Sequence, residues 1–288
     1  MITASLVKEL REKTNAGMMD CKKALTETDG DIDAAATWLR EKGISKAAKK
    51  AEREASEGII AARLSADGKT GILIEVNCET DFVARNDNFV ALVEEVADIL
   101  AASDANDLES ALKVSKDDGT LDDYIKSKVI EVGENVMLRK FERLELSDHG
   151  AIAQYIHMGG KVGVLVEVGA KQGDTTAKDD FRSLVKDITL HIAAAAPKGL
   201  SRDDIPADLV EQEKEVYRAQ LANEGKPAEI IEKIIQGKIG KFFSETCLLE
   251  QAFVKDPDQK IGKLVEAASK ELGDNLEIRR FVRFGLGE

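Results

Sequence analysis

The chain has 288 residues, is 43% hydrophobic and carries a formal net charge of −13. This length provides enough apolar material for one to three domains with buried cores. The acidic balance disfavours direct binding of nucleic acid, which relies on clustered lysine and arginine. No apolar run approaches the roughly 20 residues of a membrane span, so we expect no membrane association and a cytoplasmic protein.

Residues 1–45 predict a small module of three helices. Apolar residues recur at helical spacing in three segments, and Gly17 and Asp29-Gly30 separate these segments. The net charge is +2 over residues 1–53 and −15 over the rest of the chain, which indicates a separate first unit. Residues 46–57 are charged and rich in alanine, and they predict a solvated helical linker.

The rest of the chain contains an internal duplication. At a constant offset of 92, residues 58–76 align without gaps on residues 150–168, and both predict strand, glycine-containing turn, strand. One helix follows at the same offset, and a second helix and a third strand match at an offset of 140. Each copy therefore predicts a β-β-α-α-β subdomain, with a small antiparallel sheet backed by helices, and the fold class is α+β. The first copy covers residues 58–146, and the second covers residues 150–196 and 246–288.

The second copy is interrupted by an insertion over residues 197–245. Two amphipathic patterns separated by Gly225-Lys226-Pro227 predict an antiparallel helical hairpin. The second of these helices has a wide aliphatic stripe that needs a partner to cover it. We expect the stripe to pack either on the parent domain or on a second copy of the chain, which would form a homodimer.

The sequence contains no recognisable catalytic constellation. Lys69 follows a glycine, but Arg63 stands where a phosphate-binding loop requires another glycine. The three histidines lack the spacing of metal ligands, and Cys78 lies beside acidic residues that disfavour a thiolate. We therefore expect no cofactor and no bound metal.

The two copies diverge completely between their second strand and first helix. The first copy has Cys78-Glu79-Thr80-Asp81-Phe82-Val83 where the second has Ala170-Lys171-Gln172-Gly173-Asp174-Thr175. Phe82 either folds into the core or stays outside as an anchor for another protein. Because the second copy has Asp174 at the matching position, the fold does not need an aromatic residue there, and we favour the anchor.

Four segments together closely resemble bacterial elongation factor Ts: this loop, Gly17-Met18-Met19-Asp20-Cys21, His157-Met158-Gly159-Gly160-Lys161 and Arg279-Arg280-Phe281. The resemblance covers nearly the whole chain. It implies a guanine-nucleotide exchange factor in translation elongation, which binds elongation factor Tu with GDP bound or with no nucleotide and acts without bond chemistry. It also implies that the N-terminal module is similar to a ubiquitin-associated domain.

The resemblance also implies roles for individual residues. The segment that enters the partner near its magnesium ion and displaces that ion would be Thr80, Asp81, Phe82 and Val83. Further partner contacts would come from Met18, Met19, His157, Met158 and Gly159. The spacing of Met18 to Cys21 and Leu25 favours a core position for Met18 instead. One alternative function is an adaptor that binds a partner through the N-terminal module alone. Another is a thiol enzyme that uses Cys78.

Overall fold

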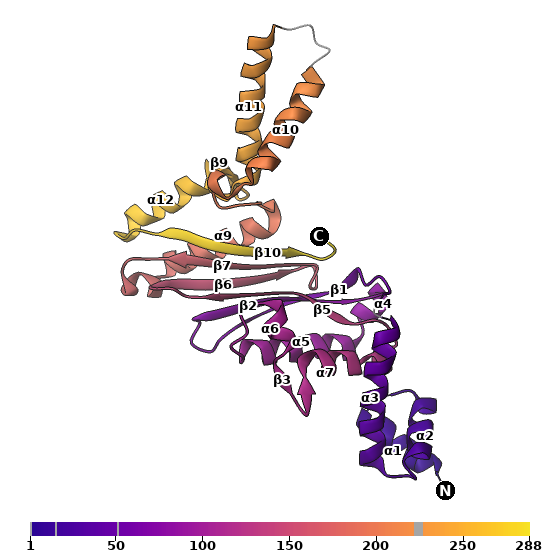
Figure 1. Ribbon diagram of the computed structural model, residues 1–288. Helices are drawn as coiled ribbons and strands as arrows, with labels where there is room; N and C mark the ends of the chain where they lie inside the picture. The colour runs from indigo at the N-terminus through magenta and orange to yellow at the C-terminus, as the bar shows by residue number, and fades with distance from the viewer. Residues whose placement is uncertain (1, 15, 51, 222–226) are drawn as a thin grey trace. The chain divides into compact units, whose positions relative to one another are not determined.

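The computed structural model describes residues 2–14, 16–50, 52–221 and 227–288 (Figure 1). Small antiparallel sheets combine with helices, three of which are N-terminal, and this confirms the predicted α+β class. The chain divides into two compact units. The first comprises Met1–Leu144, Ile156–Gly163 and Phe284–Glu288, and the second comprises Glu145–Tyr155 and Val164–Arg283. Within the described ranges, no helix is both long and apolar enough to cross a bilayer.

Three helices open the first unit: α1 (Ala4–Thr14), α2 (Met18–Glu27) and α3 (Ile32–Lys50). They enclose a small apolar core built from Val7, Leu10, Cys21, Ala24, Leu25, Ala35 and Leu39. Helix α3 continues through Lys50 and so includes the first residues of the helical linker predicted for 46–57. No helix-breaking residue lies between residues 44 and 50, and the one glycine before them, Gly43, lets α3 pass directly against the backbone of Ser127.

The first sheet has the strand order β1-β2-β5, formed by β1 (Glu57–Leu64), β2 (Thr70–Cys78) and β5 (Met137–Glu145). Alternate residues of β2 pack against the apolar face of α5 (Asp87–Ala101), where Phe89, Val93 and Val96 are fully buried. The remaining elements of this copy are α4 (Asp81–Ala84), α6 (Leu108–Leu112), β3 (Ser115–Lys116), β4 (Gly119–Thr120), α7 (Leu121–Ser127) and α8 (Val129–Val132).

The second sheet repeats this arrangement with the order β10-β7-β6, formed by β6 (Gly150–His157), β7 (Val162–Gly169) and β10 (Glu277–Gly285). Helices α9 (Asp179–Ala195) and α12 (Ile261–Leu272) bury Phe181, Ile188 and Ile261 against one face of the sheet (Figure 1). Short elements complete the copy: η1 (Gly173–Ala177), η3 (Leu248–Glu250), β8 (Ala252–Phe253) and β9 (Asp256–Lys260).

Each sheet also buries one glutamate at the same place in the duplication. Glu75 on β2 is fully buried, and Lys140 Nζ lies 2.8 Å from its Oε2. Glu167 on β7 is equally buried and accepts from Arg280 at 2.7 Å and from Arg279 at 3.1 Å. Burial would raise the pKa of the Glu167 carboxyl, but the hydrogen bonds from Arg280, Ser147 and Arg279 outweigh burial and lower it. Both carboxylates are therefore paired charges inside the fold.

The insertion forms a hairpin of α10 (Ala207–Leu221) and α11 (Ala228–Thr246), preceded by η2 (Arg202–Asp204). Leu221, Ile235 and Ile239 are buried between the two helices, while Ile205, Phe242 and Cys247 form a second cluster. The aliphatic stripe is thus largely covered within the chain. Of the predicted break, Pro227 caps the start of α11, whereas residues 225 and 226 lie outside the described residues.

Gly58 is a position where the fold requires glycine. Its φ is +149°, and a β-carbon there would collide with the carbonyl oxygen of Val76 on the paired strand. We expect Gly58→Ala to lower the free energy of unfolding by about 1–3 kcal/mol. Gly237, on α11 with open space around it, is the matched control, and there alanine should raise that free energy by about 0.5–1 kcal/mol. Urea denaturation measures both changes, and a Gly58→Ala variant as stable as the wild type would contradict the steric argument.

Candidate functional site

The divergent loop of the first copy ends in a single helical turn, α4. Thr80 caps this turn, since its hydroxyl oxygen accepts from the amide of Val83 at 3.3 Å. Val83 and Ala84 face the core of the first sheet. Asp81 and Arg85 form an exposed ion pair at 3.0 Å one turn apart. The direction of α4 is therefore fixed at both its start and its inner face.

Phe82 points away from the core and is 83% exposed. Of the two alternatives that the sequence left open, the structure excludes burial of this ring in the core. In the second copy, η1 replaces α4, with Asp174 at the position that matches Phe82 and the buried Thr175 at the position that matches Val83. A large aromatic side chain held in water on a short, well-anchored turn is a typical docking residue.

Glu134, which follows α8, holds the backbone of this loop. Its Oε2 accepts from the amides of Glu79 and Thr80 at 3.0 and 2.9 Å, and its Oε1 accepts from the Thr80 hydroxyl at 2.6 Å. In return, the amide of Asn135 donates to Glu79 Oε1 at 2.7 Å. One carboxylate thus fixes the segment that precedes Phe82, through charge-assisted hydrogen bonds.

The second copy has the same contact with a shorter side chain. Asp274 accepts from the amides of Lys171 and Gln172 at 3.2 and 3.1 Å, and these residues match Glu79 and Thr80 at the offset of 92. Glu134 and Asp274 match at the offset of 140, between a matched glycine and a matched asparagine. Sequence analysis missed Glu134 as a site residue, although this repeated acidic position was a usable signal.

Cys78 lies directly under the loop and donates to the carbonyl oxygen of Thr80 at 3.2 Å. Burial, together with the charge of Glu134, raises the pKa of the Cys78 thiol to about 12. A thiol that stays protonated at neutral pH is a poor nucleophile, so Cys78 serves packing. Among the described residues, no group of three or more His, Cys, Asp or Glu side chains could hold a metal ion.

The second predicted segment is the turn between β6 and β7. His157, Met158 and Gly159 are exposed, and Met158, which is 70% exposed, has a φ of +50°. Gly160 is buried, and its carbonyl oxygen accepts from the amide of Ile60 on β1 at 2.8 Å.

An ion pair fixes where this turn lies. Lys161 Nζ lies 2.7 Å from an oxygen of Glu57, the residue of β1 that is paired with Cys78 at the end of β2. Because α4 follows β2 directly, the turn and the Phe82 loop lie at the same end of the first sheet.

The third predicted segment, Met18 and Met19, opens helix α2 in the N-terminal module. Met18 is 58% exposed and Met19 is 76% exposed, so the predicted core position of Met18 is wrong. The helix begins at Met18, and the buried residues of its inner face start one turn later, at Cys21. The two methionines therefore present polarizable apolar side chains to solvent, which is typical of adaptable binding surfaces.

Comparison with known proteins gives one consistent result. Residues 79–288 match the family described as Elongation factor TS. The chain is 50% identical over 288 residues to a protein named elongation factor Ts from Halothermothrix orenii, covering 98% of this chain and 91% of that protein. It is 48% identical over 287 residues to an elongation factor Ts from a Nitratiruptor species, covering 100% of this chain and 93% of that protein. It is also 45% identical over 291 residues to one from Clostridium novyi, covering 100% and 94%.

We expect Glu134→Ala to loosen the Phe82 loop without unfolding the chain. The variant loses three hydrogen bonds, so the amides of Glu79 and Thr80 should exchange with solvent faster, and the free energy of unfolding should fall by about 1–3 kcal/mol. Hydrogen exchange followed by NMR measures the first change. Asp274→Ala is the matched control, which should free the amides of Lys171, Gln172 and Asn275 and leave those of Glu79 and Thr80 protected. Unchanged protection of Glu79 and Thr80 in Glu134→Ala would show that the carboxylate does not hold the loop.

Proposed function

The chain belongs to the elongation factor Ts family, and on that premise we propose that it releases GDP from elongation factor Tu by inserting Thr80–Val83 beside the partner's magnesium and phosphate site. Membership of the family makes the chain a translation elongation factor and a nucleotide exchange factor for elongation factor Tu. It acts by binding and carries out no bond chemistry of its own.

The observation that carries the proposal is the exposed ring of Phe82 on a loop that is already ordered. Thr80 caps the turn, and Glu134 fixes the two amides before it. A loop held in its binding conformation loses little conformational entropy when a partner covers it. Most of the roughly 1.5–3 kcal/mol from burying a Phe side chain is then available to deform the partner.

The chemistry of a bound nucleotide suggests how this deformation acts. A GTPase holds GDP through its phosphate loop and through a magnesium ion that keeps several waters and few protein ligands. An aromatic ring wedged between partner helices would shift the switch elements that support this ion. Asp81 would stand beside the displaced ion, with its carboxylate oriented by Arg85.

Thermodynamic linkage then makes the effect reciprocal. If this chain lowers the affinity of the partner for GDP, GDP must lower the affinity of the partner for this chain by the same factor. The nucleotide-free complex is the intermediate in which the chain binds most tightly. Incoming GTP or GDP then expels the chain, so that one molecule acts repeatedly in the cytoplasm.

Two further surfaces complete the proposed contact with elongation factor Tu. The turn of His157, Met158 and Gly159 lies at the same end of the first sheet as Phe82, and a single partner can therefore cover both. Met18 and Met19 offer an exposed apolar pair on the N-terminal module. We assign these five residues to positioning the partner, because none of them belongs to the loop that would reach the phosphates.

We expect Phe82→Ala to fold normally and to lose most of its exchange activity. The side chain is 83% exposed, so the free energy of unfolding should change by less than about 0.5 kcal/mol. Release of labelled GDP from elongation factor Tu, followed by stopped-flow fluorescence, should slow by roughly 10–100-fold at equal concentration. Val254→Ala, which truncates another exposed apolar residue, should leave the rate unchanged.

Other outcomes identify other functions. If Phe82→Ala melts several degrees lower, the ring belongs to the core and the wedge is wrong. If the wild type binds elongation factor Tu without accelerating GDP release, while Met19→Glu abolishes binding, the chain is an adaptor that acts through its N-terminal module. That result would show that the partner binds at α2 and that the Phe82 loop is not the functional site.

For the hairpin we propose self-association through the side that α10 and α11 leave uncovered. Val216 on α10 is 49% exposed and Ile230 on α11 is 47% exposed, whereas Ile231, Ile234, Ile235 and Ile239 of α11 pack within the chain. We expect the wild type to sediment as a dimer at high concentration and Val216→Glu/Ile230→Glu to sediment as a monomer, because the charges would be desolvated in the interface. A wild type that is monomeric at every concentration in analytical ultracentrifugation would contradict this proposal.

A further inference from the structure

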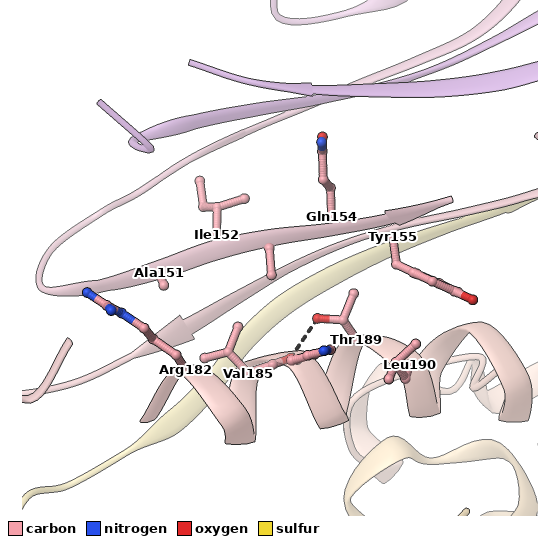
Figure 2. Close-up of a pocket in the computed structure, with 10 residues that line it drawn as sticks. Ala151, Ile152, Gln154, Tyr155, Arg182, Val185, Thr189 and Leu190 are labelled. Atoms are coloured by element: carbon pink, nitrogen blue, oxygen red, sulfur yellow. Dashed lines mark hydrogen bonds between the residues drawn. The ribbon is translucent and has the colours of Figure 1, made fainter. Parts of the chain in front are cut away.

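An open apolar groove runs between strand β6 and helix α9 in the second unit (Figure 2). Its volume is about 430 Å³. The strand contributes Ala151, Ala153 and Tyr155, and the helix contributes Val185, Thr189 and Leu190. The Thr189 hydroxyl donates to the carbonyl oxygen of Val185 at 2.6 Å, so it does not need a partner from the groove. The walls are therefore mostly apolar, and the hydroxyl of Thr189 has its partner within α9.

At the matching place in the first unit, ion pairs join the strand to the helix. Arg63 on β1 reaches across to α5, where it pairs with Glu94 and, at 2.6 Å, with Asp98. The offset of 92 places Tyr155, Lys186 and Leu190 at these three positions of the second copy. The second copy therefore lacks the charged clasp that ties strand to helix in the first copy, and the space remains open.

The groove follows the free edge of a sheet. Strand β6 is the outer strand in the order β10-β7-β6, and five consecutive residues, Ala151–Tyr155, line the groove. In the first copy, the amide of Ile60 on the edge strand β1 has a hydrogen-bond partner outside the sheet, because it donates to the carbonyl oxygen of Gly160. Its duplicate is Ile152, and within the described residues the backbone of Ala151–Gln154 makes no hydrogen bond to backbone outside the sheet. An unpaired edge of this kind is a template for another strand.

The charges at the rim have one sign. Among the described residues that line the groove, the charged ones are Arg182 and Lys186, although the whole chain carries a net charge of −13. Arg182 forms an ion pair with Asp179 at 3.7 Å, and both side chains are largely exposed. Such an exposed pair is weak. The rim therefore favours a ligand that brings carboxylates.

We propose that this groove binds an extended segment of another protein, which adds to β6 as a further strand. The segment would place small apolar side chains, alternating along its length, over Ala153 and Leu190, and would place carboxylates beside Arg182 and Lys186. A second copy of this chain is a poor occupant, because antiparallel pairing of two β6 strands would bring the cationic rims of the two copies together. This binding site is distinct from the proposed exchange function and does not depend on it.

The first experiment selects for the ligand without presupposing its sequence. A library of random decapeptides displayed on phage is panned against the full-length protein, with Tyr155→Arg/Lys186→Glu/Leu190→Asp as the counter-target. This variant restores the three residue types that close the first copy. We expect enriched peptides to alternate apolar residues and to contain aspartate or glutamate. If no enriched peptide binds the wild type more tightly than the variant, the proposal is wrong.

The second experiment measures an enriched peptide, made synthetically with a fluorescent label. Its anisotropy on full-length protein should show affinity that falls with added salt and falls about tenfold or more in Lys186→Glu. Lys263→Glu is the matched control, a charge reversal on the exposed face of α12, and should have little effect. Binding should also protect amides of β6 from hydrogen exchange.

Each contrary result overturns the proposal. Equal binding by the closed variant would place the ligand elsewhere, and protection confined to other strands would do the same. A peptide in which lysine replaces the acidic residues should not bind. If it binds as well as the original, the cationic rim does not select the ligand. Concentration-dependent dimerisation that Lys186→Glu changes would assign the groove to a second copy instead.

Discussion

The carboxylate of Glu134 is the contact on which the exposed loop depends. Strand β2 ends at Cys78, and the next two amides would lack partners without an acceptor at this place. Glu134 accepts from both amides and from the Thr80 hydroxyl, and this leaves the hydroxyl oxygen free to cap α4. The cap aims Val83 inward and Phe82 outward. The exposure of the ring is thus a consequence of hydrogen bonds made one turn earlier.

The duplication shows which features serve the fold and which serve something else. Both copies keep a buried glutamate in the middle strand, an acidic clamp on the loop and a glycine against the partner strand. They differ at the loop that carries Phe82, at the position where Arg63 ties strand to helix in only one copy, and at the inserted hairpin. A side chain that one copy has and the other lacks is not required by a shared architecture. The Phe82 loop, the groove and the hairpin surface therefore lie at points of divergence.

Periodicity and the constant offsets were enough to predict the α+β class, both three-stranded sheets and the hairpin, because these depend on apolar faces that recur along the chain. The two small strand pairs, β3 with β4 and β8 with β9, are too short for such a pattern. Met18 was misplaced because helical spacing gives a face but not the point where the helix begins. Glu134 was missed because its partners lie 54 and 55 residues away, a distance over which only the fold brings groups together.

On the proposed mechanism, the rigidity of the loop determines how much of the free energy of docking can be used to weaken the binding of GDP. A flexible loop would lose roughly 1–2 kcal/mol of backbone entropy for each residue ordered on binding, and four such residues would offset the whole gain from burying Phe82. The hydrogen bonds of Glu134 and the Thr80 cap already order the loop in the free chain, so little of this entropy remains to be lost on binding. A coupling of 1–3 kcal/mol between two ligands corresponds to about 5–150-fold in affinity, and the proposed burial of one aromatic side chain, roughly 1.5–3 kcal/mol, is of the same magnitude. On the proposed mechanism, the hydrogen bonds of Glu134 would therefore influence the rate of exchange by holding Phe82 in its docking position.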